Sequence, residues 1–129
     1  MLFDSICDKT KSVIDIGCGN GLFTKNITDK FRNILSIDIN PIRVKNLKGY
    51  FEKEGIQNVT VLEMSAYTIE MNDNIFDEAI FYRSIDHILN YYLALKEAYR
   101  VLKHQGRIYI NILDTRYSTN KTKNRDNCK

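Results

Sequence analysis

The chain has 129 residues, of which 43% are hydrophobic and 27% charged, a composition typical of one soluble globular domain with a single core. No apolar run is long enough to span a bilayer, and the start Met1-Leu2-Phe3-Asp4 lacks the layout of a signal peptide. Three scattered cysteines predict neither a disulfide framework nor a metal site. We therefore expect a cytoplasmic protein without a membrane segment.

The net charge of +3 comes entirely from residues 114–129, which carry five basic and two acidic side chains. This segment has almost no apolar residues, so we expect a core domain over 1–113 and a basic, disordered tail over 114–129. Contact of the tail with RNA or phosphate is the alternative.

The first predicted strand, Val13–Ile16, runs into a glycine-rich loop, and a helical pattern opens at Gly21. Glycines allow this sharp turn, and a helix N-terminus favours an anionic group. The spacing departs from the G-x-G-x-x-G fingerprint of dinucleotide sites. Asp15, two residues before Gly17, would repel a pyrophosphate but attract an ammonium group. The loop thus favours a nucleotide-type cofactor that carries an ammonium group, with a loop that only turns the chain as the alternative.

The remaining predicted elements alternate between helices and strands. The first helix carries the stripe Phe23, Ile27 and Phe31 and is followed by a strand over 33–38. The second helix is capped by Asn40, has Pro41 at its first position and buries Ile42, Leu47 and Phe51; strands over 59–62 and 76–81 follow it. A third helix over 90–103 has Tyr92, Leu95, Ala98, Tyr99 and Leu102 at helical spacing, and after a break at Gly106 the last strand covers 107–113. This alternation predicts an α/β fold with a doubly wound parallel sheet. Its ligand should lie beyond the carboxyl ends of the strands, where the first strand meets the fourth.

The pattern D-x-G-x-G-x-G at residues 15–21 resembles motif I of the class I S-adenosylmethionine-dependent methyltransferases. Four further segments match that family in order: Asp38 after the second strand, Met64-Ser65-Ala66, Phe76-Asp77, and Glu97–Lys103 followed by Gly106. The resemblance covers about residues 11–113. It implies a Rossmann-like sheet of strand order 3-2-1-4-5, S-adenosyl-L-methionine as cofactor, and methyl transfer to a small molecule, with an RNA substrate as an alternative.

The resemblance also implies which residues hold the cofactor. Asp38 would bind both ribose hydroxyls, Ile39 would pack on the adenine, and Tyr82 would line the methionine end. Ser65 stands where the family has an acid, and it can still accept a hydrogen bond from the adenine amino group. Asp38 as a turn residue and Ser65 as a loop cap are the alternatives. The implied cofactor-binding residues are Asp15, Gly17, Cys18, Gly19, Gly21, Asp38, Ile39, Ser65, Ala66 and Tyr82.

Substrate residues are expected after the fourth strand. His87 stands where many small-molecule methyltransferases also have histidine, and it is a candidate base or substrate-orienting residue. A polar residue at the start of a helix is the alternative for His87. Arg83 is a candidate for binding an anionic substrate, with a solvated arginine as the alternative.

The family's sheet has two more strands after the fifth, which the polar residues 114–129 are not able to supply. We therefore expect either a reduced methyltransferase core or a fragment. A non-catalytic cofactor-binding module, or a subunit that needs a partner chain, is the alternative function. The unpaired side of the fifth strand should recruit a second copy or a partner chain.

Overall fold

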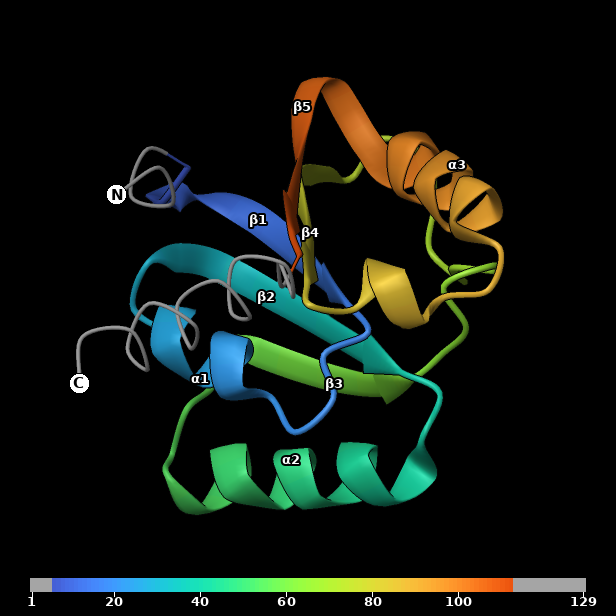
Figure 1. Ribbon diagram of the computed structural model, residues 1–129. Helices are drawn as coiled ribbons and strands as arrows, with labels where there is room; N and C mark the ends of the chain where they lie inside the picture. Colours follow the sequence, from blue (N-terminus) through green and yellow to red (C-terminus); the bar gives the residue numbers. More distant parts are fainter. Residues whose placement is uncertain (1–5, 113–129) are drawn as a thin grey trace, which may run out of the picture.

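The computed structural model describes residues 6–112, which form one parallel sheet with helices on both faces (Figure 1). The elements are β1 (Asp8–Ile16), α1 (Leu22–Ile27), β2 (Phe31–Asp38), α2 (Pro41–Lys53), β3 (Val59–Glu63), β4 (Phe76–Tyr82), the 3₁₀ helix η2 (Ile85–His87), α3 (Tyr91–Val101) and β5 (Leu102–Asn111). The strand order is β3-β2-β1-β4-β5, and every pair is parallel. The predicted α/β fold, with its doubly wound sheet of order 3-2-1-4-5, is confirmed.

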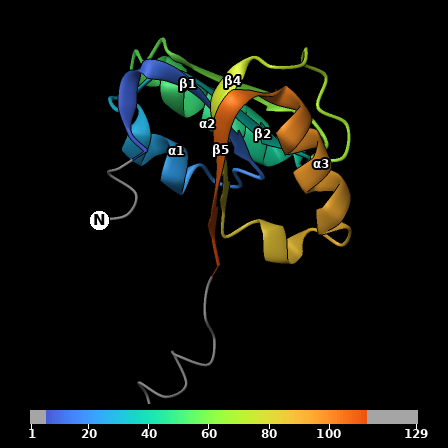
Figure 2. The same cartoon turned by 90° about the horizontal axis from the view of Figure 1, so that it is seen from above.

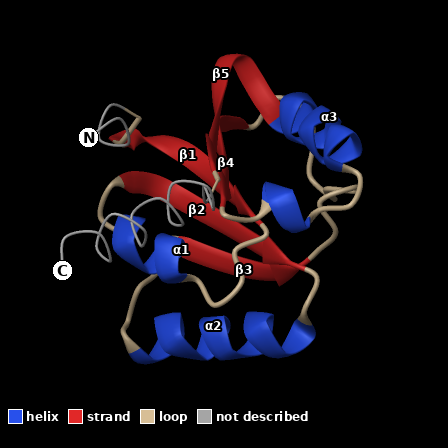
Figure 3. Cartoon of the chain, in the orientation of Figure 1, coloured by secondary structure: helices blue, strands red, loops and turns tan. Residues whose placement is uncertain are grey.

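The helices α1, α2 and α3 lie on the two faces of the sheet (Figures 2 and 3). Ile27 of α1 packs with Val13 and Ile34 of the sheet, and Leu47 of α2 packs with Val61. Because Val61 pairs with Ser36, two residues after Ile34, α1 and α2 share a face. The strand residues that alternate with Val13, Ile34 and Val61 point to the other face of the sheet. Ala94 and Ala98 of α3 cover that face.

The predicted helical stripe was wrong at Phe31, which is the first residue of β2. The helix α1 ends at Ile27, and the chain turns over residues 28–30, where the Lys30 N–H donates to the Ile27 carbonyl at 3.0 Å. Phe31 is nevertheless buried against Ile27 in the same apolar cluster. Spacing alone does not distinguish a longer helix from a turn followed by a strand, because both bury Phe31.

The buried faces of the longer helices also differ from the prediction. In α2, Ile42 is exposed at the first turn and Val44 takes its place beside Leu47 and Phe51. In α3, Tyr92 and Tyr99 are exposed, while Ala94, Ala98 and Val101 are fully buried. Alanine at the contact lets a helix approach the sheet closely, which explains why the bulky tyrosines lie outside.

The last strand is longer than predicted, since β5 begins at Leu102, directly after α3, and contains Gly106. Gln105 has φ of 66°, and a Cβ at Gly106 would lie 2.9 Å from the Lys103 carbonyl oxygen. The irregular register between Phe76 and Glu78 falls at this point. Gly106 therefore permits a kink inside the strand and does not end a helix.

Some predictions fall outside the described residues, namely Leu113 as a strand residue and the disordered tail over 114–129. Within residues 6–112, no helix is long and apolar enough to cross a membrane. The cytoplasmic location stays a prediction.

Candidate cofactor and substrate site

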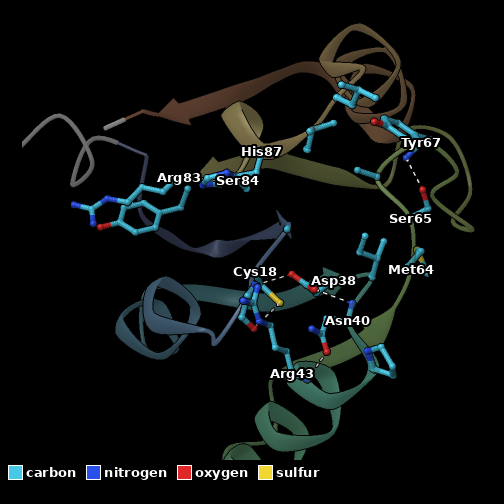
Figure 4. A pocket seen from close by; sticks show the side chains of 18 of the residues that line it. Cys18, Asp38, Asn40, Arg43, Met64, Ser65, Tyr67, Arg83, Ser84 and His87 are labelled. Carbon is cyan, nitrogen blue, oxygen red and sulfur yellow. Dashed lines mark hydrogen bonds between the residues drawn. The ribbon is translucent and has the colours of Figure 1, made fainter. Parts of the chain in front are cut away.

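A cavity of about 1130 Å³ lies at the carboxyl ends of β1, β2, β3 and β4, where the sheet order reverses (Figure 4). Every predicted site residue lines it except Asp15 and Gly21. The predicted residues that line it are Gly17, Cys18, Gly19, Asp38, Ile39, Ser65, Ala66, Tyr82, Arg83 and His87. Segments that are far apart in the sequence thus meet at the predicted place.

The glycine loop is held by hydrogen bonds within the protein. The N–H groups of Gly17 and Cys18 both donate to the Ile37 carbonyl at 2.9 Å, and Gly21 N–H donates to the Cys18 carbonyl. These N–H groups of the loop are therefore engaged within the protein. The expectation of an anionic group at the N-terminus of α1 stays a prediction.

Two of the loop glycines are required by their neighbours. Gly17 has φ of 73°, and a Cβ there would lie 2.8 Å from the Cβ of Ser84. Gly21 has φ of 76°, and a Cβ there would collide with Leu47 of α2. Gly21 therefore serves the packing of the loop on α2 and lies away from the cavity.

Asp38, at the end of β2, joins the glycine loop to the start of α2. Its Oδ2 accepts from the Gly19 N–H at 2.8 Å, and its Oδ1 accepts from the Asn40 N–H at 2.9 Å. The side chain is 8% exposed. A carboxylate has about four lone-pair positions, so each oxygen of Asp38 keeps room for one further hydrogen bond. The turn role is thus present, and the geometry leaves two acceptors for a pair of neighbouring hydroxyls.

The side of the cavity next to Asp38 is apolar. Ile39 is 72% exposed although it follows a buried strand, and Ile42 lies beside it on the cavity wall. Such an exposed aliphatic side chain suits the face of a planar ring. Ser65 Oγ accepts from the Tyr67 N–H at 3.1 Å, so the loop-cap role is observed, and the adenine contact stays a prediction.

Asp15 lies beneath the glycine loop and does not line the cavity. It is 1% exposed, and its Oδ2 accepts from the Thr24 hydroxyl at 2.6 Å. Burial, with a smaller contribution from the charge of Asp38, raises the pKa of Asp15 to about 6, although the Thr24 hydrogen bond acts in the opposite direction. Asp15 therefore acts on the cavity through its charge and not by contact.

The segment after β4 forms the opposite side of the cavity. The ring of Tyr82 stacks on Phe23, with centroids 4.5 Å apart, and the guanidinium of Arg83 lies 5.4 Å from the Tyr82 centroid. Arg83 has φ of 52°, a conformation rare for a residue with a side chain. The side chain of His87 is 80% exposed, and its Nε2 lies 4.0 Å from Asp86 Oδ2. Both substrate candidates thus belong to the residues that line the cavity.

Nine of the lining residues were not predicted as site residues, and among these Asn40, Arg43, Tyr67 and Ser84 carry polar side chains. Ser84 is buried and donates to the Ile16 carbonyl at 2.7 Å, so it ties the end of β1 to the segment after β4. Arg43 lines the cavity from the first turn of α2. Tyr67 accepts from the Asn90 N–H at 2.9 Å and joins the loops that follow β3 and β4. Of Ser84, Arg43 and Tyr67, only Arg43 could have been found from the sequence, because it stands three residues after the Asn40 cap and therefore in the first turn of the predicted helix.

Among the described residues, no group of three or more histidine, cysteine, aspartate or glutamate side chains is placed to hold a metal ion. Two carboxylates and the guanidinium of Arg43 act on the thiol in the glycine loop. Burial, followed by the charges of Asp15 and Asp38, raises the pKa of the Cys18 thiol, so this thiol is kept protonated.

Comparison with known proteins identifies relatives of this site and fold. A family described as "Methyltransferase domain" matches residues 14–110. YrhH of Bacillus subtilis, which carries the name of a methyltransferase, is 30% identical over 115 residues, covering 87% of this chain and 63% of that protein. The ubiquinone/menaquinone biosynthesis C-methyltransferase UbiE of Zymomonas mobilis is 30% identical over 100 residues, covering 78% of this chain and 41% of that protein. The chain thus spans less than two thirds of these relatives.

Solved structures agree on the fold. The PH0226 protein of Pyrococcus horikoshii superposes with a TM-score of 0.81 at 28% identity, covering 95% of this chain and 58% of that one. An S-adenosylmethionine-dependent methyltransferase from Aquifex aeolicus superposes with a TM-score of 0.73 at 24% identity, covering 79% of this chain and 56% of that one.

Proposed function

This chain belongs to the class I S-adenosylmethionine-dependent methyltransferases, and on that premise we propose that it binds S-adenosyl-L-methionine in the cavity described above and transfers the methyl group to a small molecule. The observation that carries the proposal is the meeting of Asp38 and Ile39 with the glycine loop on one cavity wall. This wall offers acceptors for a ribose beside an apolar surface for a base.

The residues present fit this cofactor. Asp38 keeps one acceptor position on each oxygen, which suits two neighbouring hydroxyls. The loop N–H groups of Gly17, Cys18 and Gly21 already donate within the protein, which suits a ligand without phosphate. Asp15 and Asp38 make this end of the cavity negative, which favours a ligand with an ammonium group.

When bound, the cofactor supplies a methyl group on a positively charged sulfur. The chain's own residues then mainly align the acceptor atom, since the leaving group is already good. His87 is the candidate that takes a proton where the acceptor must lose one, because its side chain is exposed to the cavity. Arg83, which lines the cavity, is the candidate for binding a negative charge on the substrate.

A second candidate function is a non-catalytic cofactor-binding module, or a subunit completed by a partner chain. The 80% exposure of the side chain of His87, the candidate base, favours it. Both candidates bind the cofactor, and only the first consumes it.

We also propose that β5 pairs with the β5 of a second copy of this chain. Within residues 6–112, β5 pairs only with β4, and Ile110 and Ile112 near its end are 41% and 58% exposed. An unpaired apolar edge recruits other strands, and pairing with its own copy gives a closed dimer. Light scattering over a range of concentrations should show a dimer, and a monomer at every concentration would contradict this.

The test of the function is a methyl-transfer screen with a library of small acceptors. Formation of S-adenosylhomocysteine should depend on one class of acceptor and should fall in Asp38→Ala. A chain that binds the cofactor but turns over with no acceptor supports the non-catalytic module instead.

A further inference from the structure

Three buried polar side chains form a continuous chain beneath the glycine loop. They are Asp15 of β1, Thr24 of α1 and Ser36 of β2, and each is at most 1% exposed. Thr24 Oγ1 lies 2.6 Å from Asp15 Oδ2 and 2.9 Å from Ser36 Oγ. The three residues therefore link β1, α1 and β2 at the base of the cofactor site.

The direction of these hydrogen bonds follows from the number of protons. Thr24 has one hydroxyl proton, and the ionised carboxylate of Asp15 is able only to accept. Thr24 therefore donates to Asp15, which leaves Ser36 to donate to Thr24. Both hydroxyls are thus oriented toward Asp15, in the arrangement that stabilises its negative charge.

The other oxygen of Asp15, Oδ1, is buried and has no hydrogen-bond partner among the described residues. Its surroundings favour the neutral carboxyl, because burial and the charge of Asp38 both raise the pKa of Asp15 while the Thr24 bond lowers it. The Thr24 hydroxyl is therefore the one identified contact that holds Asp15 toward its charged form.

The charge of Asp15 reaches the cavity although its side chain does not. Asp15 and Asp38 both act on the Cys18 thiol, and Cys18 lines the cavity. A cation on the cavity side of Cys18 would thus lie in the field of both carboxylates.

From this arrangement, and resting on the proposed cofactor, we propose that Thr24 and Ser36 are positioning residues that hold Asp15 ready to ionise, so that uptake of a ligand with an ammonium group drives one proton from Asp15 into solvent. The ammonium group stabilises the carboxylate form, and the proton leaves to the buffer. Binding of such a ligand should then strengthen as the pH rises through about 6.

Several titratable or charged groups surround Asp15. The ring of Tyr50 lies 4.1 Å from the Lys25 ammonium, so this cation of α1 has a partner elsewhere. The other titratable or charged groups near Asp15 are Asp38 on β2, Cys18 in the loop, and Glu78 and Tyr82, two residues to either side of its β4 register partner Ile80. Arg43 of α2 is a cation on this side of the loop, where it acts on Cys18 against the two carboxylates. The pKa of Asp15, raised to about 6, lies close to neutral pH.

The test is calorimetric titration between pH 5 and 8 with two ligands. One is S-adenosylhomocysteine, and the other is 5′-methylthioadenosine, which lacks the amino-acid end. The affinity of S-adenosylhomocysteine should rise about tenfold from pH 5 to 7, with proton release near pH 6, and that of methylthioadenosine should stay flat. Equal profiles for the two ligands would overturn the proposal.

Variants separate this role from a structural one. Thr24→Val should shift the S-adenosylhomocysteine profile toward higher pH, weakening binding about tenfold at pH 7, because a bond to a charged group is lost. Thr24→Ser should keep the wild-type profile, and Ser36→Ala, the second variant, should shift it less. Equal weakening of both ligands in Thr24→Val and Ser36→Ala would show a structural role only. Absence of binding by either ligand would contradict the proposed cofactor site itself.

Discussion

Carboxylates at the two ends of the sheet differ in whether they form ion pairs. Toward the amino ends of the strands, carboxylates have cations: Glu78 pairs with Arg107 at 2.9 Å and Lys11 at 3.5 Å, and Asp77 pairs with Lys103 at 3.3 Å. At the carboxyl ends, Asp15 and Asp38 are buried and make no ion pair with a described residue. At the first end the carboxylates are paired with cations, and at the second the two buried carboxylates are not, although Arg43 lies nearby.

Asp15 and Glu78 allow a direct comparison of the two ends, because they lie close together on one face of the sheet. Glu78 is the register partner of Val13, two residues before Asp15. Each has one buried oxygen without a hydrogen-bond partner among the described residues. An unpaired oxygen therefore does not mark a ligand site by itself. What distinguishes Asp15 from Glu78 is that it makes no ion pair with a described residue.

The largest expected effect is on the pH dependence of stability in the ligand-free protein. Because folding raises the pKa of Asp15, its contribution to stability is complete below about pH 4 and is lost as the pH rises through about 6, amounting to roughly 3 kcal/mol. Asp15→Asn should remove this part of the slope, as measured by urea unfolding at several pH values. The same slope in both proteins would contradict the burial argument.

His87→Ala should lower turnover by about 100-fold with an acceptor that must lose a proton, since a positioned base is removed. The affinity for S-adenosylhomocysteine should not change. His104→Ala is the matched control, because this second histidine lies at the other end of the sheet, in β5. Unchanged turnover in His87→Ala would leave His87 as a solvated polar residue.

Asp38→Ala should weaken S-adenosylhomocysteine binding by about 1.5–3 kcal/mol, the range for hydrogen bonds to a charged group. Asp38→Asn should lose less, because one acceptor oxygen remains. Calorimetry measures both, and wild-type affinity in Asp38→Ala would reduce Asp38 to a turn residue.

In contrast to Asp38→Ala, which should weaken binding, Glu78→Gln should lower the free energy of unfolding and leave the cofactor affinity unchanged. We expect a loss of about 1–2 kcal/mol, since the partners Lys11 and Arg107 are one third to one half exposed and recover hydration. Denaturant unfolding and a parallel titration check this. Weaker cofactor binding at constant stability would contradict the claim that Glu78 serves stability and not the cofactor site.

Local patterns predicted the parts of the structure that depend on local chemistry. The glycine loop, Asn40 with Pro41, and Asp38 at a strand end each have a backbone reason to be where they are, so they were found in the sequence. The loop cap at Ser65 was likewise foreseen as an alternative and is observed.

The parts that depend on tertiary packing were not predictable in the same way. The assignment of Phe31 to β2 depends on pairing with β1, and the outward position of Tyr99 depends on how closely α3 approaches the sheet. Ser84 gains its role only because β1 and β4 end side by side. The burial of Asp15 behind the loop is of the same kind.

Calorimetric titration of the whole chain with S-adenosylhomocysteine and with NAD tests most directly whether the cavity at the carboxyl ends of the strands binds S-adenosylmethionine. S-adenosylhomocysteine should bind and raise the melting temperature, as a ligand of the native state does. NAD should do neither at the same concentration. Tighter binding of NAD, or no binding of S-adenosylhomocysteine, would contradict the account.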